Sequence, residues 1–335
     1  NFEDFVNYCS MTKENIFSMR DPLHRNLLHI ATLEQEIGIV RYLATYKEEF
    51  LNELDQDGQT ALSLAIREEK YFIARILLLH GADPKLGGGA FGSALHMVTS
   101  KHQAGMVKEL LKHGANPNVG DLEGNTPLHL LFSVFSKNLE VSKEIAQLLV
   151  DYGADPNQLN NDLWTPLHLA IRRGQTDCLR WVIETNNKNK AKEKKLFNLD
   201  ARGGSDKWAP LHLAANLSQY EIINILLENN VDVMVKTKMG KTPRDVAMSN
   251  PIIMKVLKKM EVVWSKMHLV NPKMTPAASQ NNQGLKNNVN VMNLENIVPN
   301  VAKTQLQLRG KISSAGSARP STGGAKIRNA SSGGR

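Results

Sequence analysis

Apolar residues recur along the chain with the spacing of short amphipathic helices. The segment Ile73–Leu79 is almost continuously apolar, and Val107, Leu110 and Leu111 fall at the i, i+3, i+4 spacing of a buried helix face. Such segments are followed by Gly-Ala-Asp-Pro or Gly-Ala-Asn-Pro at 81–84, 114–117 and 153–156. Glycine supplies the left-handed residue that ends a helix, so the pattern predicts many short helices with sharp stops.

A second landmark repeats in phase with the first. Thr-Pro-Leu-His occurs at 126–129 and 165–168, Pro-Leu-His at 210–212, and weaker copies lie at 27–31, 60–65, 93–97 and 242–247. The residues at the His position are 29, 63, 96, 129, 168, 212 and 245, which gives steps of 34, 33, 33, 39, 44 and 33. Thr can cap a helix whose first turn holds the Pro, where no amide donor is needed. A fixed period of this length indicates a solenoid of stacked helix pairs.

These two landmarks resemble the ankyrin repeat, over about Asn15 to Met267. The resemblance implies an all-α ankyrin-repeat solenoid of helix-turn-helix units with β-hairpin-like tips. It also implies that the His bonds to the Thr and to neighbouring backbone, which gives the five His at 29, 96, 129, 168 and 212 a structural role.

The period divides the chain into four parts. Residues 1–14 fit a partial repeat or an N-terminal cap, 15–250 hold about seven repeats, 251–269 read as a capping helix, and 270–335 as a disordered basic tail. The long steps predict insertions near 133–139 and within 187–200. Leu163 and Lys207 replace the usual hairpin glycine, so we expect distorted tips there. Because residue 1 is Asn and not Met, we also expect that the chain begins inside a longer protein.

Charge is partitioned between body and tail. Residues 270–335 hold nine of the 41 Lys and Arg residues and one of the 33 Asp and Glu residues, which leaves 32 of each in residues 1–269. The tail therefore carries the whole net charge of +8. Cations spaced by Ser, Gly and Pro are typical of segments that lie along polyanions.

The sequence contains no candidate site for catalysis, metal binding or cofactor binding. Cys9 and Cys178 belong to no Cys/His cluster, and the remaining His lack the spacing of metal ligands. Gly240-Lys241-Thr242 lacks the earlier glycine of a phosphate-binding loop. We expect a non-enzymatic protein with no cofactor, no small-molecule substrate and no membrane partner. A nucleic-acid partner is disfavoured because the tail has no aromatic residues for base stacking and the body is neutral.

The candidate site is a protein-binding groove. In ankyrin proteins the hairpin tips and inner helices form this groove, and the residue four before each His is expected to project into it. That position holds Arg25, Gln59, Gly92, Asn125, Trp164, Trp208 and Lys241. Trp and Arg are enriched at binding hot spots. The predicted protein-binding residues are Trp164, Trp208, Arg172, Arg173, Asn216 and Leu217. The alternative is that each Trp packs on its neighbouring hairpin.

A second set of residues is predicted to contact an acidic partner. It comprises the lysines of the 187–200 insertion and the basic residues of the tail, namely Lys188, Lys190, Lys192, Lys194, Lys195, Arg309, Lys311, Arg319, Lys326 and Arg328. For the insertion, the alternative is a solvated loop. The hypothesis is a scaffold or adaptor in the cytoplasm, at the cytoskeleton or a cilium, whose tail lies on tubulin in a microtubule or axonemal assembly. The alternative is a soluble signalling regulator whose groove captures a partner domain and whose tail is a linker.

Overall fold

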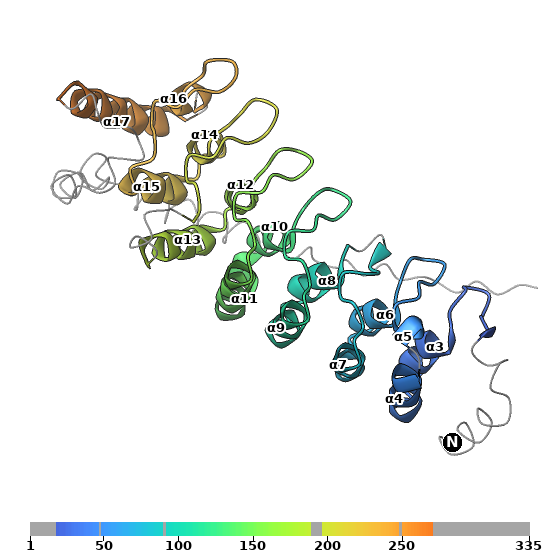
Figure 1. Cartoon of the computed structure of the whole chain (residues 1–335). Helices are drawn as coiled ribbons and strands as arrows, with labels where there is room; N and C mark the ends of the chain where they lie inside the picture. Colours follow the sequence, from blue (N-terminus) through green and yellow to red (C-terminus); the bar gives the residue numbers. More distant parts are fainter. Residues whose placement is uncertain (1–17, 47, 90–91, 189–195, 248–249, 271–335) are drawn as a thin grey trace, which may run out of the picture. The chain divides into compact units, whose positions relative to one another are not determined.

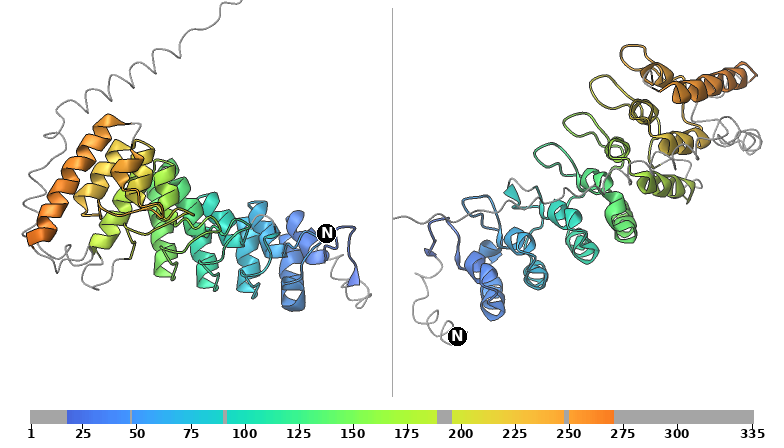
Figure 2. Two further views of the ribbon diagram at one scale, coloured as in Figure 1. Left: turned by 90° about the horizontal axis from the view of Figure 1, so that it is seen from above. Right: turned by 180° about the vertical axis from the view of Figure 1, so that it is seen from behind.

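The computed structural model describes residues 18–270 apart from 47, 90–91, 189–195 and 248–249. Within these residues all regular elements are helical, which confirms the all-α prediction. The helices alternate between an inner and an outer row, and the loops that lead into the inner helices project to one side (Figure 1). Two further views show the same stacking order (Figure 2). Residues 1–14 and all of the tail after Val270 lie outside the described part of the chain.

The inner row contains the helices that begin at the repeat motif. They are α3 (Leu27–Leu33), α6 (Ala61–Arg67), α8 (Ala94–Ser100), α10 (Pro127–Ser133), α12 (Pro166–Arg172), α14 (Pro210–Asn216) and α16 (Pro243–Val246). Each begins after a residue with extended backbone. At Thr126 and Thr165 the side-chain hydroxyl accepts a hydrogen bond from the backbone N–H of the His three residues later. The motif therefore sets where each inner helix starts.

The outer row contains the longer helices. They are α4 (Ile37–Tyr46), α7 (Tyr71–Leu79), α9 (Ala104–Lys112), α11 (Leu139–Asp151), α13 (Thr176–Lys188), α15 (Tyr220–Glu228) and α17 (Pro251–Val270), with the short α5 (Glu48–Leu51) after α4. Leu77, Leu110, Leu149 and Leu226 of this row are completely buried between the rows. No helix in the described part of the chain is both long and apolar enough to span a bilayer.

The two insertions meet in one aromatic cluster. The first forms a 3₁₀ helix, η2 (Phe135–Asn138), and the second returns to the stack at Phe197. Phe135 and Phe197 are fully buried against Phe132 and Trp181, with ring centroids 5.6 to 6.1 Å apart. The two departures from the period therefore share one core.

A pair of hydrogen bonds closes the second insertion at its base. The Asn186 amide donates to the Phe197 carbonyl and accepts from the Phe197 N–H, each over 2.9 Å. Asn186 is itself buried. These bonds join the residue before the insertion to Phe197 near its end, so they hold the two ends of the inserted segment together.

The hairpin tips keep their hydrogen bonds where glycine is replaced. Leu163 adopts a φ of 64°, and its N–H still donates to the Asn160 carbonyl over 2.9 Å. Lys207 adopts a φ of 54°, and Gly203 and Trp208 exchange two backbone bonds of 2.8 and 2.7 Å. The expected distortion is therefore wrong for Leu163, whose tip keeps the usual bonds because the side chain accepts a left-handed backbone in place of glycine. At Lys207 the tip does differ, because Gly203 and not Gly204 pairs with Trp208.

Candidate protein-interaction site

The five repeat His are buried and join each repeat to the next hairpin. Their Nε2 atoms lie 2.8 to 3.1 Å from the backbone carbonyls of Gln59, Asn125, Trp164, Trp208 and Lys241 respectively. A carbonyl only accepts, so Nε2 carries the proton and Nδ1 is free to accept. In four of the five, Nδ1 accepts a backbone N–H at the start of its own helix. These His are structural, as the motif resemblance implied.

Burial keeps these imidazoles neutral. It lowers the pKa of His168 to about 4, against the hydrogen bond to the Trp208 carbonyl, which raises it. Burial also lowers the pKa of His212, and the charge of Asp232 opposes that change. A neutral ring that donates from one nitrogen and accepts at the other fits a structural tie.

The residue four before the His does not always face the groove. Gln59 is 1% exposed and Asn125 is 5% exposed, so the prediction that this position projects outward is wrong for these two repeats. The Asn125 side chain instead accepts a bond of 2.8 Å from Asn160 of the next hairpin. Lys241 is exposed, as predicted.

Trp164 packs on the next hairpin. A β-carbon added at Gly204 would lie 2.6 Å from Trp164 Cη2, and one added at Gly203 would lie 2.9 Å from Cε3. The indole therefore covers the backbone of both glycines and leaves no room for a side chain there. Its ring centroid also lies 5.2 Å from that of His168. Trp164 therefore packs on its neighbouring hairpin, which was the alternative to a role in the groove.

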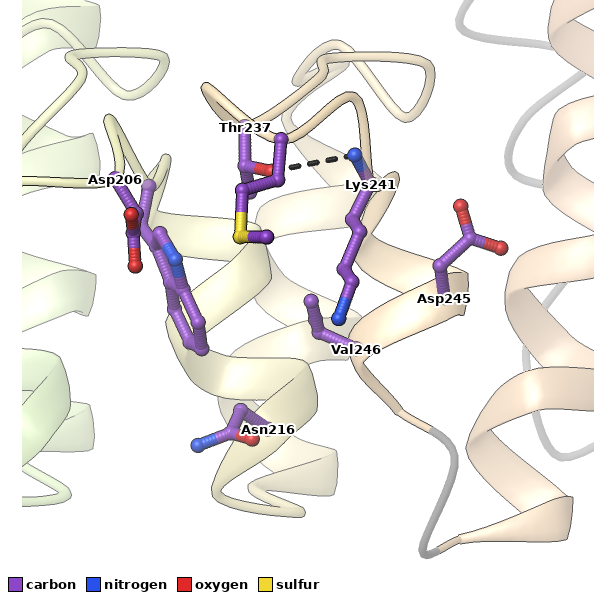
Figure 3. A pocket seen from close by; sticks show the side chains of 8 residues that line it. Asp206, Asn216, Thr237, Lys241, Asp245 and Val246 are labelled. Atoms are coloured by element: carbon purple, nitrogen blue, oxygen red, sulfur yellow. Dashed lines mark hydrogen bonds between the residues drawn. The ribbon is translucent and has the colours of Figure 1, made fainter.

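Trp208 instead lines an open pocket between the sixth and seventh repeats (Figure 3). The pocket has a volume of about 230 Å³. Its lining residues come from two hairpin tips and from the ends of α14 and α16, and they are Asp206, Trp208, Asn216, Thr237, Met239, Lys241, Asp245 and Val246. Two predicted residues, Trp208 and Asn216, thus come together. Met239, which the repeat pattern does not indicate, is 72% exposed.

The charged groups of the pocket differ in how strongly they are already engaged. Asp245 accepts from the N–H and the hydroxyl of Thr242, both over 2.9 Å, and these bonds contribute to the lowered pKa of its carboxyl. In Figure 3 its carboxylate is turned away from Lys241, whose amine lies beside Val246. Lys241 and Asp206 form no ion pair with any described residue. Lys241 is therefore available to a ligand.

The other predicted groove residues lie at the ends of the inner helices. Arg172 and Arg173 are exposed at the end of α12 and have no ion-pair partner among the described residues. Leu217, 41% exposed, follows α14 and does not line the pocket. The Gln219 amide donates to the Ile171 carbonyl over 2.7 Å, which ties the end of α12 to the repeat that carries Asn216.

Comparison with known families identifies the architecture. The family model "Ankyrin repeats (3 copies)" matches residues 2–88 and 136–237, and "Ankyrin repeat" matches residues 93–122. The first model alone covers more than half of the chain. The chain belongs to the ankyrin-repeat family. Ankyrin repeats form protein–protein interaction domains and are typically non-catalytic.

The ankyrin-repeat relatives are similar over limited lengths. The chain is 30% identical to the nuclear factor NF-kappa-B p105 subunit of Gallus gallus over 169 residues, which is 50% of this chain and 17% of that protein. It is 47% identical to protein phosphatase 1 regulatory subunit 27 of Mus musculus over 51 residues, 15% of this chain and 30% of that protein. The chain thus spans less than a third of either relative.

A solved ankyrin-repeat domain shows the same fold. The ankyrin repeat domain of Bcl-3, described as a unique member of the IkappaB protein family, superposes with a TM-score of 0.55. The match covers 69% of this chain and 97% of that one, at 22% sequence identity.

The charge of the ankyrin hairpin tips changes sign along the stack. The second and fourth tips carry Asp55 and Asp57, and Asp121 and Glu123, and the fifth carries Asp162. The sixth tip carries Arg202 and Lys207 with Asp206, and the seventh carries Lys236, Lys238 and Lys241. All six residues of these last two tips are exposed. The Trp208 pocket thus lies at the basic end of the row.

Most residues predicted to contact an acidic partner fall outside the described chain. Of the insertion lysines only Lys188 is described, as the exposed last residue of α13. Cys178 is fully buried in α13, and burial raises the pKa of its thiol, so it behaves as an apolar core residue. Within the described residues no cluster of three His, Cys, Asp or Glu side chains could hold a metal ion.

Proposed function

We propose that the chain is a non-catalytic adaptor whose ankyrin groove binds a partner protein at the sixth and seventh repeats. The observation that carries this proposal is the Trp208 pocket, in which an aromatic face, the exposed Met239 and the unpaired Lys241 surround one hollow. Trp, Met and Arg are enriched in protein interfaces, and hot spots tend to be aromatic side chains beside a pocket. Arg172 and Arg173, exposed at the end of α12 in the fifth repeat, are proposed to add to this surface.

The experiment is site-specific photo-cross-linking in cells. A benzophenone amino acid at Asn216, which is exposed and lines the pocket, should attach covalently to the partner. The matched control is the same amino acid at Lys108, which is exposed on the outer helix α9. We expect a discrete product from position 216 that Trp208→Ala removes. Equal products from both positions would contradict binding at the groove.

The charge partition favours a second component of this function. With +8 confined to residues 270–335, the tail is proposed to lie on an acidic surface, and a microtubule or axonemal lattice of tubulin is our preferred surface. This would place the protein in the cytoplasm at the cytoskeleton or a cilium. The lysines of the insertion, from Lys188 to Lys195, carry the same sign.

Co-sedimentation with microtubules tests the tail. The full chain should pellet at low salt and be released as salt rises, whereas residues 1–269 should remain in the supernatant. If neither pellets, the cytoskeletal component is abandoned. The alternative is a soluble signalling regulator with the tail as linker. It would then be favoured, and it is consistent with the similarity to a phosphatase regulatory subunit and to the ankyrin domain of an IkappaB family member.

A further inference from the structure

We propose that the Trp208 pocket binds an acidic segment of the partner, in which an apolar anchor residue is flanked by Asp and Glu. This inference rests on the proposed function and specifies the chemistry of the ligand.

The apolar part of the ligand follows from the walls of the pocket. Trp208 is half-buried and Met239 is 72% exposed, and both border the hollow of about 230 Å³. An apolar side chain placed between them would remove both surfaces from water, which is the main source of affinity in such sites. The Trp208 position itself is fixed, because its carbonyl accepts from His168 and its backbone pairs with Gly203.

The acidic part follows from the charges of the pocket, of its two hairpin tips and of the end of α12. Lys241 lines it, Lys207 and Lys238 lie at the same two hairpin tips, and Arg172 and Arg173 lie at the end of α12. None of these five cations forms an ion pair with a described residue. Lys241 in the pocket and the two further unpaired lysines at its hairpin tips form a surface complementary to a peptide that carries several carboxylates.

Two acidic side chains also line the pocket and have to be accounted for. Asp245 is engaged by Thr242 and Arg244 and does not oppose a ligand strongly. Asp206 is exposed and has no ion pair in the described chain, so it should weaken an acidic ligand. The net charge of the sixth and seventh tips is still positive, whereas that of the second, fourth and fifth tips is negative.

The test measures binding of a fluorescein-labelled peptide to the full chain by fluorescence anisotropy at physiological salt. The peptide carries a central Phe-Leu pair between runs of Asp and Glu. Lys241→Glu and Trp208→Ala should each weaken binding by about tenfold, as expected of hot-spot positions. Asp206→Asn should tighten it a few-fold.

The matched control is Lys108→Glu, which makes the same charge change on the exposed face of α9. It should leave binding unchanged. If Lys108→Glu weakens binding as much as Lys241→Glu, or if neither pocket variant has an effect, the peptide is bound by net charge or by the basic tail, and the inference is overturned. A peptide with Lys in place of Asp and Glu that binds equally well would overturn it too.

Failure here can be separated from failure of the proposed function. If the benzophenone at Asn216 captures a protein in a Trp208-dependent manner but the acidic peptide does not bind, the groove function stands and the ligand chemistry is wrong. If neither occurs, both are wrong.

Discussion

Trp164 and Trp208 occupy the same position of two adjacent repeats and yet have different environments. Each lies four residues before a repeat His, and each accepts on its carbonyl a bond from the His of the preceding repeat. Trp164 covers Gly203 and Gly204 of the next hairpin. Trp208 faces a hairpin that offers Thr237 and Met239, and a pocket stays open beside it. The role of a residue in a solenoid is therefore decided partly by the repeat that follows.

The sharpest test of this difference is a pair of glycine substitutions. Gly204 and Gly240 have similar φ values, 71° and 76°, but a β-carbon meets the Trp164 ring at 2.6 Å in the first case and nothing within 4 Å in the second. Gly240→Ala should cost about 1 kcal/mol for the left-handed backbone. Gly204→Ala should cost about 3 kcal/mol because overpacking is added. Urea unfolding of both variants measures the two free energies.

The double variant Trp164→Ala/Gly204→Ala controls for the origin of that cost. If the clash with the indole is the cause, the two substitutions should be less than additive, because the double variant no longer has it. Equal losses in Gly204→Ala and Gly240→Ala would show that Trp164 does not pack as described.

The second prediction compares the two tryptophans directly. Trp164→Ala exposes two glycines that the ring covers, and we expect it to lower the free energy of unfolding by about 2 to 3 kcal/mol. Trp208→Ala removes a ring that borders solvent, and about 1 kcal/mol is expected. Thermal and urea unfolding check both values, and the reverse order would contradict the different roles.

The third prediction concerns pH. The folded pKa of His168 is about 4, below its ordinary value of 6.5, so between these values the unfolded chain binds more protons than the folded one. The stabilisation is complete above about pH 6.5 and is lost as the pH falls toward 4. Between pH 7 and pH 5 the contribution of His168 to this loss should be about 2 kcal/mol, and His168→Gln should lose that much less stability than the unsubstituted chain over the same pH range. A His168 NMR signal that titrates near pH 6.5 would contradict this.

The smallest expected effect is spectroscopic. A small neutral quencher such as acrylamide should reach Trp208 through the pocket more readily than it reaches Trp164. Trp208→Phe should therefore remove more of the quenchable tryptophan fluorescence than Trp164→Phe does. If Trp164→Phe removes more, the fifth repeat is the open one.

The fold followed from the sequence because its determinants are local and periodic. Thr-Pro fixes helix starts, Gly-Ala-Asp fixes helix ends, and both recur in phase, so the helix rows could be predicted. The role of the five His was implied by the resemblance for the same reason. The spacing also predicts the two insertions, since any departure from 33 residues is visible in a regular series.

The site was only partly predictable because it depends on contacts between repeats. The repeat pattern predicts Trp208 and Asn216 but not Met239, since nothing in the local sequence distinguishes Met239 from other exposed tip residues. That Gly204 makes room for Trp164 became evident only from the distances between them. The shared cluster of Phe135 and Phe197 likewise joins two insertions that looked independent in the sequence.

The pair of hydrogen bonds between Asn186 and Phe197 also has a practical consequence for protein engineering. These two hydrogen bonds and the buried Phe197 ring hold Asn186 and Phe197 together. Doubling the length of a flexible loop costs only about 0.6 kcal/mol of closure entropy. We therefore expect an epitope tag or a fluorescent reporter inserted between Lys188 and Leu196 to leave the Asn186–Phe197 bonds in place.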